Sequence, residues 1–298
     1  MNLLRVSDLS PTALVEVLAF ASESDPDPVL SGRGVALVFE HPSNRTRNAT
    51  EMAVVALGGH PVSIMKDEVG IDTRESAEDV ARTLACYHAA LCVRAVRHST
   101  LERMAVALAG TDVPLINLLS DVEHPTQAIA DVKTIADEFG TVSGQKVAYI
   151  GDANNVCRSL AFAVAALGGE FVVASPPGFG PSEEELNATK GLEGRVVVAG
   201  SPADAADGAD VLYTDVWVSM GEEGADDKRN AFVGFTIDDE LLDRAAPSAI
   251  VLHCLPAHRG EEITASVLDG PQSRVWQQAR NRLEAARGAL SYLLGGAR

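Results

Sequence analysis

Positive charge is scarce in this chain. Its 298 residues include 24 Lys and Arg against 42 Asp and Glu, which gives a formal net charge of −18. Such an acidic surface repels phosphate backbones and anionic headgroups, so neither nucleic acid nor a membrane is expected as a partner. A site for an anionic ligand must therefore gather its arginines locally.

Long apolar runs are also missing. No stretch approaches the roughly 18–20 residues that a membrane-spanning helix needs. The first five residues, MNLLR, do not begin the apolar core of a signal peptide. We therefore expect a cytoplasmic protein.

Two kinds of cofactor signature are absent. The four cysteines, Cys86, Cys92, Cys157 and Cys254, form no C-x-x-C pair and show no zinc-ligand spacing. The first three are expected to be small buried apolar residues. No full G-x-G-x-x-G fingerprint is present, which disfavours a dinucleotide. No metal or organic cofactor is predicted.

What the chain does contain is a regular alternation of short apolar runs and helical patterns. Strands are expected at residues 35–39, 62–65, 91–93, 115–119, 145–150, 171–174, 196–198, 211–214 and 249–252. Helices are expected near residues 14–21, 45–57, 77–87, 101–108, 126–139, 156–167 and 275–294. Alternation of this kind indicates parallel sheets with covering helices.

The alternation of strands and helices begins again after residue 140. This divides the chain into two halves of ordinary domain size. We predict an α/β protein of two doubly wound domains with parallel sheets, and a C-terminal helix that returns to the N-terminal domain. The predicted domains are residues 1–130 together with 280–298, and residues 131–279.

One short stretch, Pro42–Asn48, concentrates donors for an anion. It follows an apolar run and opens a helix, and it reads P-S-N-R-T-R-N. Free backbone N–H groups, capping hydroxyls and two arginines at one helix N-terminus favour phosphate. Taken alone, the same residues also fit a capped surface helix with solvated arginines.

Four further polar positions follow apolar runs. They are Arg94, the segment H-P-T-Q at 124–127, the segment G-D-A-N-N at 151–155, and the pair formed by Asp215–Gly221 and His253–Pro256. Ligands of parallel sheets bind beyond the carboxyl ends of strands, so the coincidence of all these positions favours one active site. Singly, Arg94 fits a surface charge, His124 a helix cap, and Gly151 an ordinary turn.

Together these motifs resemble the aspartate/ornithine carbamoyltransferase family. The motifs are S-x-R-T-R, a strand-end Arg, H-P-T-Q, G-D-x-N-N, D-V-W-V-S-M-G and H-C-L-P-A, in the family's order and over nearly the whole chain. The last two resemble the ornithine branch, while S-x-R-T-R and H-P-x-Q indicate only the wider family.

The resemblance implies binding sites for two substrates. For carbamoyl phosphate it implies Ser43, Asn44, Arg45, Thr46, Arg94, His124, Gln127, Cys254, Leu255 and Arg282. For L-ornithine it implies Asn155, Asp215, Ser219 and Met220. The catalytic group is implied to be Arg94, His124, Asp215, Cys254 and Arg282, working by alignment and charge stabilisation without a covalent intermediate.

The sequence departs from the family pattern in two places. Asn44 stands where Thr is usual, and Asn still caps and donates. The loop at 67–76 is acidic where many relatives carry Gln or Lys near the phosphate of the neighbouring subunit. A contact of Glu68 with that subunit is therefore in doubt. Arg74 either makes this contact in its place or is a solvated surface charge. The resemblance implies a homotrimer or a multiple of it.

The expected reaction is therefore carbamoyl transfer from carbamoyl phosphate to ornithine, giving citrulline and phosphate in arginine metabolism. Alternatives are a carbamoyltransferase for another amine, such as putrescine or an acylated ornithine, and a non-catalytic ligand-sensing relative. A dinucleotide-dependent oxidoreductase is disfavoured by the missing glycine fingerprint.

Overall fold

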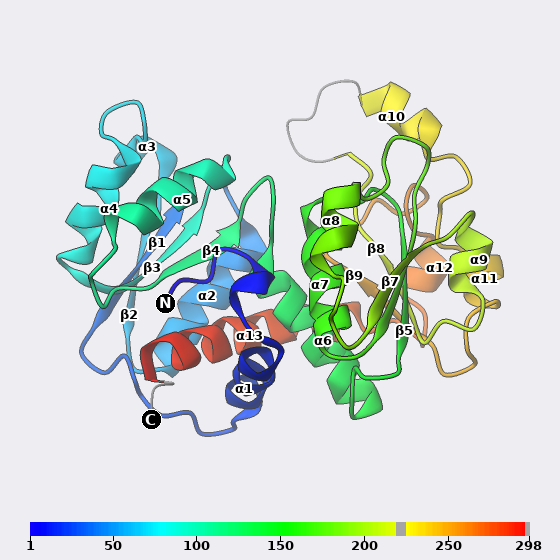
Figure 1. The fold of residues 1–298 in the computed structure, drawn as a ribbon, viewed down its shortest axis with the longest axis horizontal. Coiled ribbons are helices and arrows are strands. Elements are labelled where there is room, and N and C mark those ends of the chain that lie inside the picture. The colour runs from blue at the N-terminus through cyan, green and yellow to red at the C-terminus, as the bar shows by residue number, and fades with distance from the viewer. Residues whose placement is uncertain (219–224, 296–298) are drawn as a thin grey trace. The chain divides into compact units, whose positions relative to one another are not determined.

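The computed structural model describes residues 1–218 and 225–295. The chain forms two compact units: unit 1 comprises Met1–Ala130 and Arg280–Arg298, and unit 2 comprises Asp131–Ala279. Each unit is a parallel sheet covered by helices (Figure 1). The unit boundaries fall inside α6 (Pro125–Phe139) and α13 (Val275–Gly295), so both helices contribute to both units. The predicted α/β class with parallel sheets is confirmed.

Unit 1 has a four-stranded sheet in the order β2-β1-β3-β4. Its strands are β1 (Gly34–Phe39), β2 (His60–Met65), β3 (His88–Arg94) and β4 (Leu115–Leu119). Strands are added on one side of β1 and then on the other, so the order reverses next to β1. The loops beyond the carboxyl ends of strands at such a reversal are where open α/β sheets bind ligands.

Helices cover both faces of this sheet. They are α1 (Pro11–Ser22), α2 (Asn44–Ala56), α3 (Lys66–Val69), α4 (Ala77–Ala85) and α5 (His98–Ala107), after a 3₁₀ turn at Val6–Asp8. Ala36 and Val38 of β1 pack with apolar residues of α4 and α5. Because side chains alternate along a strand, Val35 and Leu37 face the opposite side, where α2 and α13 lie (Figure 1).

Unit 2 has a five-stranded parallel sheet in the order β7-β6-β5-β8-β9. Its strands are β5 (Lys146–Ile150), β6 (Glu170–Ala174), β7 (Arg195–Val198), β8 (Val211–Thr214) and β9 (Ile250–His253). Its other helices are α7 (Asn155–Ala166), α8 (Glu183–Ala188), α9 (Pro202–Ala206), α10 (Ala225–Ala231), α11 (Asp239–Leu242) and α12 (Ala265–Leu268). The strand order again reverses, here between β5 and β8.

The two faces of this second sheet are closed differently. Ala148, Ile150 and Leu212 pack in an apolar cluster with residues of α9, α11 and α12. On the other face the rings of Tyr149 and Tyr213 stack at 5.6 Å, and the Tyr213 hydroxyl donates to Asp131 Oδ2 of α6 at 3.0 Å. The buried tyrosine hydroxyl thus has the partner that its burial requires.

The C-terminal helix returns to the N-terminal unit, as predicted. Arg287 Nη2 donates to the carbonyls of Ala21 and Glu23 at the end of α1, both at 2.6 Å. Gly288 lies so close to α1 that a Cβ atom there would stand 2.5 Å from the Val17 carbonyl oxygen. A residue with no side chain therefore sets how closely α13 approaches α1.

Two local expectations need correction. Cys86 is exposed, not buried: it lies at the C-terminal cap of α4, and its thiol donates to the Arg82 carbonyl at 3.3 Å. Cys92 and Cys157 are buried as expected, and burial raises the pKa of Cys92 to about 12. The polar loops of the second half also contain short helices that the apolar pattern did not reveal, such as α9 and α11.

Within the described residues, no helix combines the length and the apolar character that crossing a membrane requires.

Candidate functional site

The start of α2 has the form of an anion site. Ser43 occupies the N-cap with an extended backbone, and its side chain makes no capping hydrogen bond. The hydroxyl is therefore not used to close the helix. The first N–H groups of a helix lack intrahelical acceptors and lie at the positive end of its dipole. Ser43 and the first-turn amides offer a set of donors for an oxyanion.

The two arginines of this turn have different roles. Arg47 is exposed, and its Nε donates to Glu51 Oε1 at 2.8 Å, one helical turn along the surface. Arg45 is half-buried, and its charge acts on the ring of His124. Arg45 is thus the candidate ligand for an anion, and Arg47 is the solvated arginine.

Thr46 links α2 to the C-terminal helix. Both Thr46 and Arg282 are buried, and Arg282 Nη2 donates to Thr46 Oγ1 at 2.6 Å. Because the oxygen of Thr46 accepts from the guanidinium, the hydroxyl proton is left to be donated elsewhere. This contact leaves the Thr46 hydroxyl as a further hydrogen-bond donor at the start of α2, beside Ser43.

His124 lies at the centre of the positive charges of unit 1. Its carbonyl accepts from the amides of Gln127 and Ala128, so the residue caps α6, while its side chain is 2% exposed. Burial lowers the pKa of His124 well below its usual value, and the charges of Arg282, Arg94 and Arg45 lower it further. The ring is neutral at physiological pH.

Unit 1 therefore brings together the predicted residues Arg45, Thr46, Arg94, His124 and Arg282 through hydrogen bonds or charge effects. Gln127 is buried one turn into α6. Three guanidinium groups around a neutral imidazole suit a dianion joined to a polar, uncharged group. They also suit the stabilisation of negative charge that develops on an oxygen.

Asp215 of unit 2 follows β8 and is 6% exposed. Burial raises the pKa of Asp215, while the electrostatic interaction with His253 and a hydrogen bond from Asn154 act in the opposite direction. Asn154 Nδ2 donates to Asp215 Oδ2 at 3.0 Å. The charged form of a buried carboxylate held in this way is stabilised most by a cationic partner such as an ammonium group.

Asn154 is a residue that sequence reasoning missed. It caps α7, with its Oδ1 accepting from the amides of Val156 and Cys157, and it also orients Asp215. The predicted Asn155 is the first residue of α7. The adjacent pair Asn154-Asn155 was the only signal, because the cap and the contact with Asp215 depend on the fold.

The side chain of His253 holds the turn that follows β9 by hydrogen bonding. The Leu255 amide donates to His253 Nδ1 at 2.8 Å, and His253 Nε2 lies 3.1 Å from Glu262 Oε1. Leu255 has a left-handed backbone, with φ of +62°. Cys254 is buried at the same turn. Both Cys254 and Leu255 belong to unit 2, while the other predicted carbamoyl phosphate ligands belong to unit 1.

Two predicted ornithine ligands, Ser219 and Met220, lie outside the described residues.

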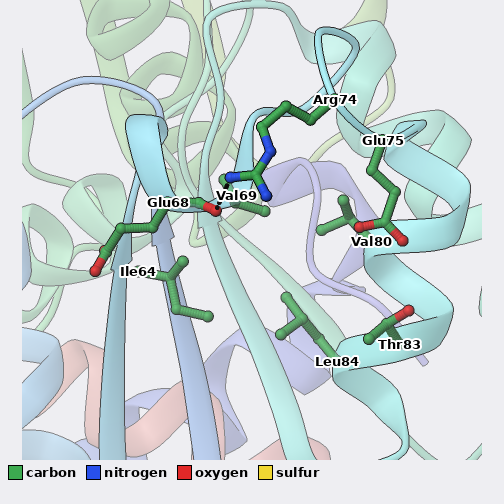
Figure 2. Close-up of a pocket in the computed structure, with 8 residues that line it drawn as sticks. All are labelled: Ile64, Glu68, Val69, Arg74, Glu75, Val80, Thr83 and Leu84. Atoms are coloured by element: carbon green, nitrogen blue, oxygen red, sulfur yellow. Dashed lines mark hydrogen bonds between the residues drawn. The ribbon is translucent and has the colours of Figure 1, made fainter.

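The acidic loop after β2 lines a pocket of about 350 Å³ (Figure 2). Glu68 turns back on its own helix, its Oε2 accepting from the Met65 amide at 2.6 Å. Arg74 Nη1 donates to the Glu68 carbonyl at 3.2 Å. The apolar lining comes from Ile64, Val69, Val80 and Leu84. None of the predicted carbamoyl phosphate ligands lines this pocket.

One group of potential metal ligands occurs among the described residues: His258, Glu261 and Glu262, with ligand atoms within 4.8 Å of one another. Glu261 accepts from Arg229 Nε at 3.0 Å, and Glu262 Oε1 accepts from the His258 amide at 2.5 Å. These contacts engage Glu261 and the Oε1 atom of Glu262. We assign the group to holding the turn that follows Cys254.

Comparison with known proteins matches both halves of the chain to one family. Residues 1–137 match the model described as aspartate/ornithine carbamoyltransferase, carbamoyl-P binding domain. Residues 143–293 match the model described as aspartate/ornithine carbamoyltransferase, Asp/Orn binding domain.

Curated relatives and solved structures agree with this match. The ornithine carbamoyltransferase of Acidothermus cellulolyticus is 48% identical over 304 aligned positions, covering 97% of this chain and 95% of the relative. That of Hyperthermus butylicus is 44% identical, covering 90% and 86%. The structure of ornithine carbamoyltransferase from Pyrococcus furiosus superposes with a TM-score of 0.94 at 38% identity, covering 100% of this chain and 98% of that one. The resemblance drawn from the motifs is confirmed, and the chain belongs to the aspartate/ornithine carbamoyltransferase family.

Proposed function

We propose that this chain transfers the carbamoyl group of carbamoyl phosphate to the side-chain amine of L-ornithine, giving L-citrulline and phosphate. The observation that carries the proposal is the convergence of Arg45, Arg94 and Arg282 on a buried, neutral His124. The relatives named above are ornithine carbamoyltransferases, which favours ornithine over aspartate as the substrate. The product belongs to arginine metabolism.

Unit 1 binds carbamoyl phosphate. The phosphate is held by the start of α2, through Ser43, the first-turn amides that begin at Asn44, and the Thr46 hydroxyl whose oxygen accepts from Arg282. Arg45 and Arg94 supply charge to the dianion. Charge-assisted and bidentate hydrogen bonds of this kind are the strongest polar contacts available to a protein.

The carbamoyl oxygen is held by His124 and Arg282, and Gln127 contacts the carbamoyl amide. When the amine attacks the carbonyl carbon, negative charge builds on that oxygen before the bond to the phosphate oxygen breaks. A neutral imidazole N–H and a guanidinium already in place stabilise this charge without reorganisation. The carbonyl groups of Cys254 and Leu255 accept from the carbamoyl NH₂.

Unit 2 binds ornithine. Asp215, oriented by Asn154, pairs with the α-ammonium group, and Asn155 with Ser219 and Met220 holds the carboxylate. The attacking side-chain amine must be neutral, although an amine of this type has a pKa near 10.4 in water. Desolvation lowers that pKa, and we assign Asp215 and Cys254 as the groups that accept the departing proton.

The test is a panel of amines offered with carbamoyl phosphate, with carbamoylated product measured for each. Ornithine should exceed putrescine, N-acetylornithine and aspartate in kcat/KM by about a hundredfold or more, because the smaller or blocked amines leave buried polar groups unpaired. Equal turnover of putrescine would contradict the assignment of ornithine. Absence of product with every amine would favour a ligand-sensing relative.

A further inference from the structure

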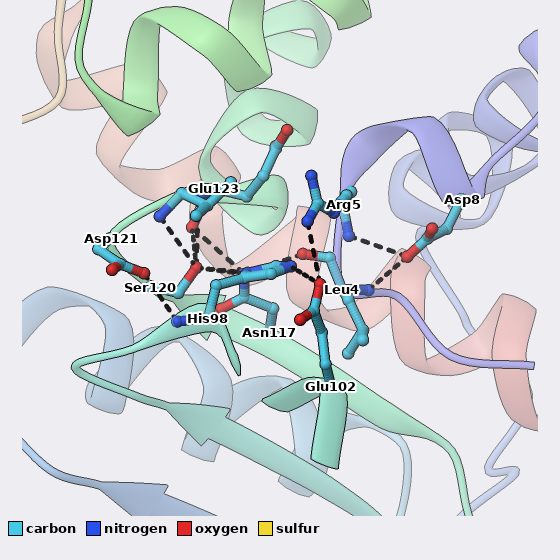
Figure 3. Close-up of polar contacts among 10 residues, drawn as sticks. Leu4, Arg5, Asp8, His98, Glu102, Asn117, Ser120, Asp121 and Glu123 are labelled. Carbon is cyan, nitrogen blue, oxygen red and sulfur yellow. Dashed lines mark hydrogen bonds and ion pairs between the residues drawn. The ribbon is translucent and has the colours of Figure 1, made fainter. Parts of the chain in front are cut away.

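A cluster of polar side chains, three of them buried and one exposed, holds the loop that leads into His124, residues 120–124 between β4 and α6. The cluster consists of His98, Asn117, Ser120 and Asp121, and we call it the Ser120 cluster (Figure 3). His98, Asn117 and Ser120 are between 0% and 3% exposed. None of these residues belongs to the substrate ligands proposed above.

Ser120 Oγ is the centre of the cluster. It lies 2.8 Å from His98 Nδ1 and accepts from Asn117 Nδ2 and from the Glu123 amide, each at 3.2 Å. The loop is fixed at a second point, where the His98 amide donates to Asp121 Oδ1 at 2.7 Å. The side chains thus tie the start of α5 to the loop.

The peptide groups next to His124 are held on both sides. The Glu123 amide donates to Ser120 Oγ, and the Glu123 carbonyl accepts from the Ser120 amide at 2.9 Å and from Asn117 Nδ2 at 3.3 Å. The following carbonyl, that of His124, accepts the first helical bonds of α6. The backbone of His124 therefore has little freedom to shift.

Hydrogen bonding assigns the protons of this cluster. Ser120 Oγ accepts from the N–H groups of Asn117, Val122 and Glu123. Its own proton has two acceptors in reach, and His98 Nδ1 at 2.8 Å is nearer than the Glu123 carbonyl at 3.4 Å, so we assign the proton to His98 Nδ1. That requires a neutral His98 with the proton on Nε2. Burial lowers the pKa of His98, and the charge of Arg5 lowers it further, against the opposing charges of Glu102, Asp121 and Asp8. The neutral ring is therefore the stable form at neutral pH.

We propose that His98, Asn117 and Ser120 are positioning residues for His124, which set the ring at the place where charge develops on the carbamoyl oxygen. The inference rests on the role proposed for His124. An ångström of displacement at a catalytic group costs up to about a hundredfold in rate. The cluster fixes the loop backbone, so its loss lowers kcat more than it weakens the binding of carbamoyl phosphate, which depends on α2.

A matched pair of substitutions at His98 tests the proposal. Asn carries an acceptor oxygen close to the position of Nδ1, whereas Leu fills similar space without one. We expect kcat of His98→Leu to fall about tenfold or more with the KM for carbamoyl phosphate within about threefold, and kcat of His98→Asn to stay within about threefold. Equal values of kcat in the two variants would overturn the proposal, as would a loss expressed only in KM.

Two further variants separate positioning from general damage. Ser120→Ala should lower kcat as His98→Leu does. Ser291→Ala, which also removes a buried hydroxyl from unit 1, should leave kcat unchanged. Assays well below the thermal midpoint of each variant keep the comparison to folded enzyme. A kcat for Ser120→Ala that equals that of Ser291→Ala would overturn the proposal.

A double-mutant cycle of Ser120 and His124 distinguishes failure of this inference from failure of the proposed function. His124→Asn alone should lower kcat; if it does not, the proposed role of His124 is wrong. In the His124→Asn background, Ser120→Ala should have no further effect on kcat, because Ser120 acts through His124. Full additivity of the two losses, with His124→Asn impaired, would leave the function intact and refute the positioning role.

Discussion

In each unit, one of the proposed site residues is a buried titratable group whose environment opposes its charged form. In unit 1, burial and three arginines keep His124 neutral. In unit 2, burial raises the pKa of Asp215, so its carboxylate is held at a cost in stability. Perturbed groups of this kind mark functional sites more often than structural ones. Two residues that the proposed chemistry needs, His124 and Asp215, therefore have perturbed pKa values.

Because burying the Asp215 carboxylate costs folding free energy, its replacement by Asn is expected to affect stability and ornithine binding in opposite directions. Asp215→Asn removes a buried charge, while its amide oxygen still accepts from Asn154. We expect the thermal midpoint to stay level or rise. The KM for ornithine should rise at least about tenfold, since the ammonium loses a charged partner worth roughly 1.5–3 kcal/mol. Steady-state kinetics and thermal melts measure both, and a lowered midpoint with an unchanged KM would contradict the assignment.

The neutral ring of His124 predicts a pH dependence of stability. The folded-state pKa lies below the value of about 6.5 that an unfolded histidine has. Below about pH 6.5 the unfolded chain takes up a proton that the folded state resists, so stability falls as the pH is lowered. At pH 5.5 this amounts to about 1.4 kcal/mol for one such group.

Urea unfolding at pH 7.5 and 5.5 checks this for the parent chain and for His124→Asn. The loss of unfolding free energy between the two pH values should be smaller in the variant by about 1 kcal/mol. His88 and His98, whose pKa values burial also lowers, contribute to the dependence that remains in the variant. Parallel curves for the two proteins would show that His124 is not held neutral.

Arg45 and Arg47 provide a matched comparison within one helical turn. Arg45→Ala should weaken carbamoyl phosphate binding about 10- to 100-fold, the loss expected for a charge-assisted hydrogen bond. Arg47→Ala should change affinity less than about twofold, because its partner is Glu51 on the surface. Calorimetric titration with carbamoyl phosphate alone measures both. Similar losses in the two variants would mean that general positive charge, not Arg45, binds the phosphate.

At the scale of elements, apolar periodicity located the strands well and the short helices poorly. Residues 115–119 and 211–214 were predicted with the bounds that β4 and β8 have. Strands β2 and β3 begin at His60 and His88, before their apolar runs. The backbone hydrogen bonds between neighbouring strands do not require apolar side chains, so polar residues can extend a strand. Helices of four or five residues, such as α9 and α11, have too few turns to show a period.

The contact of α13 with α1 predicts the effect of a single methyl group. In an open helix, Gly→Ala stabilises by about 1 kcal/mol. At Gly288 the added Cβ would stand 2.5 Å from the Val17 carbonyl and 2.8 Å from the Ala21 Cβ. Gly288→Ala should therefore lower the free energy of unfolding, by about 1–3 kcal/mol.

Gly180→Ala is the control, since its nearest neighbour, Ser175 Cβ, is 4.0 Å from the added atom. It should be neutral or slightly stabilising, by up to about 1 kcal/mol. Chemical denaturation of both variants provides the comparison. Stabilisation by Gly288→Ala would show that α13 does not pack against α1 as described.

For the whole molecule, sequence motifs predicted residues near strand ends but not the contacts between them. Position after a strand sufficed to single out Arg94 and His124. Arg282 lies in a late helix with no such signal, and only the family resemblance indicated it; its bond to Thr46 depends on α13 returning to unit 1. Asn154 and Glu262 were missed for the same reason: each acts through a partner distant in sequence, Asp215 and His253 respectively.

Unit 1 exposes large apolar side chains on and next to its helices: Met52 and Val55 of α2 are 51% and 50% exposed, and Tyr87 after α4 is 74% exposed. Separate exposed apolar side chains are ordinary on a protein surface, so the expectation of assembly rests on the family resemblance, and these side chains are chosen as its test positions. We expect a homotrimer or a multiple of it, so light scattering after size exclusion should give at least about three times the chain mass of 31.3 kDa. Met52→Lys and Tyr87→Lys should shift the assembly towards smaller species, whereas Val233→Lys, at a position in unit 2 that is 77% exposed, should not. A fully active monomer at micromolar concentration would contradict the prediction.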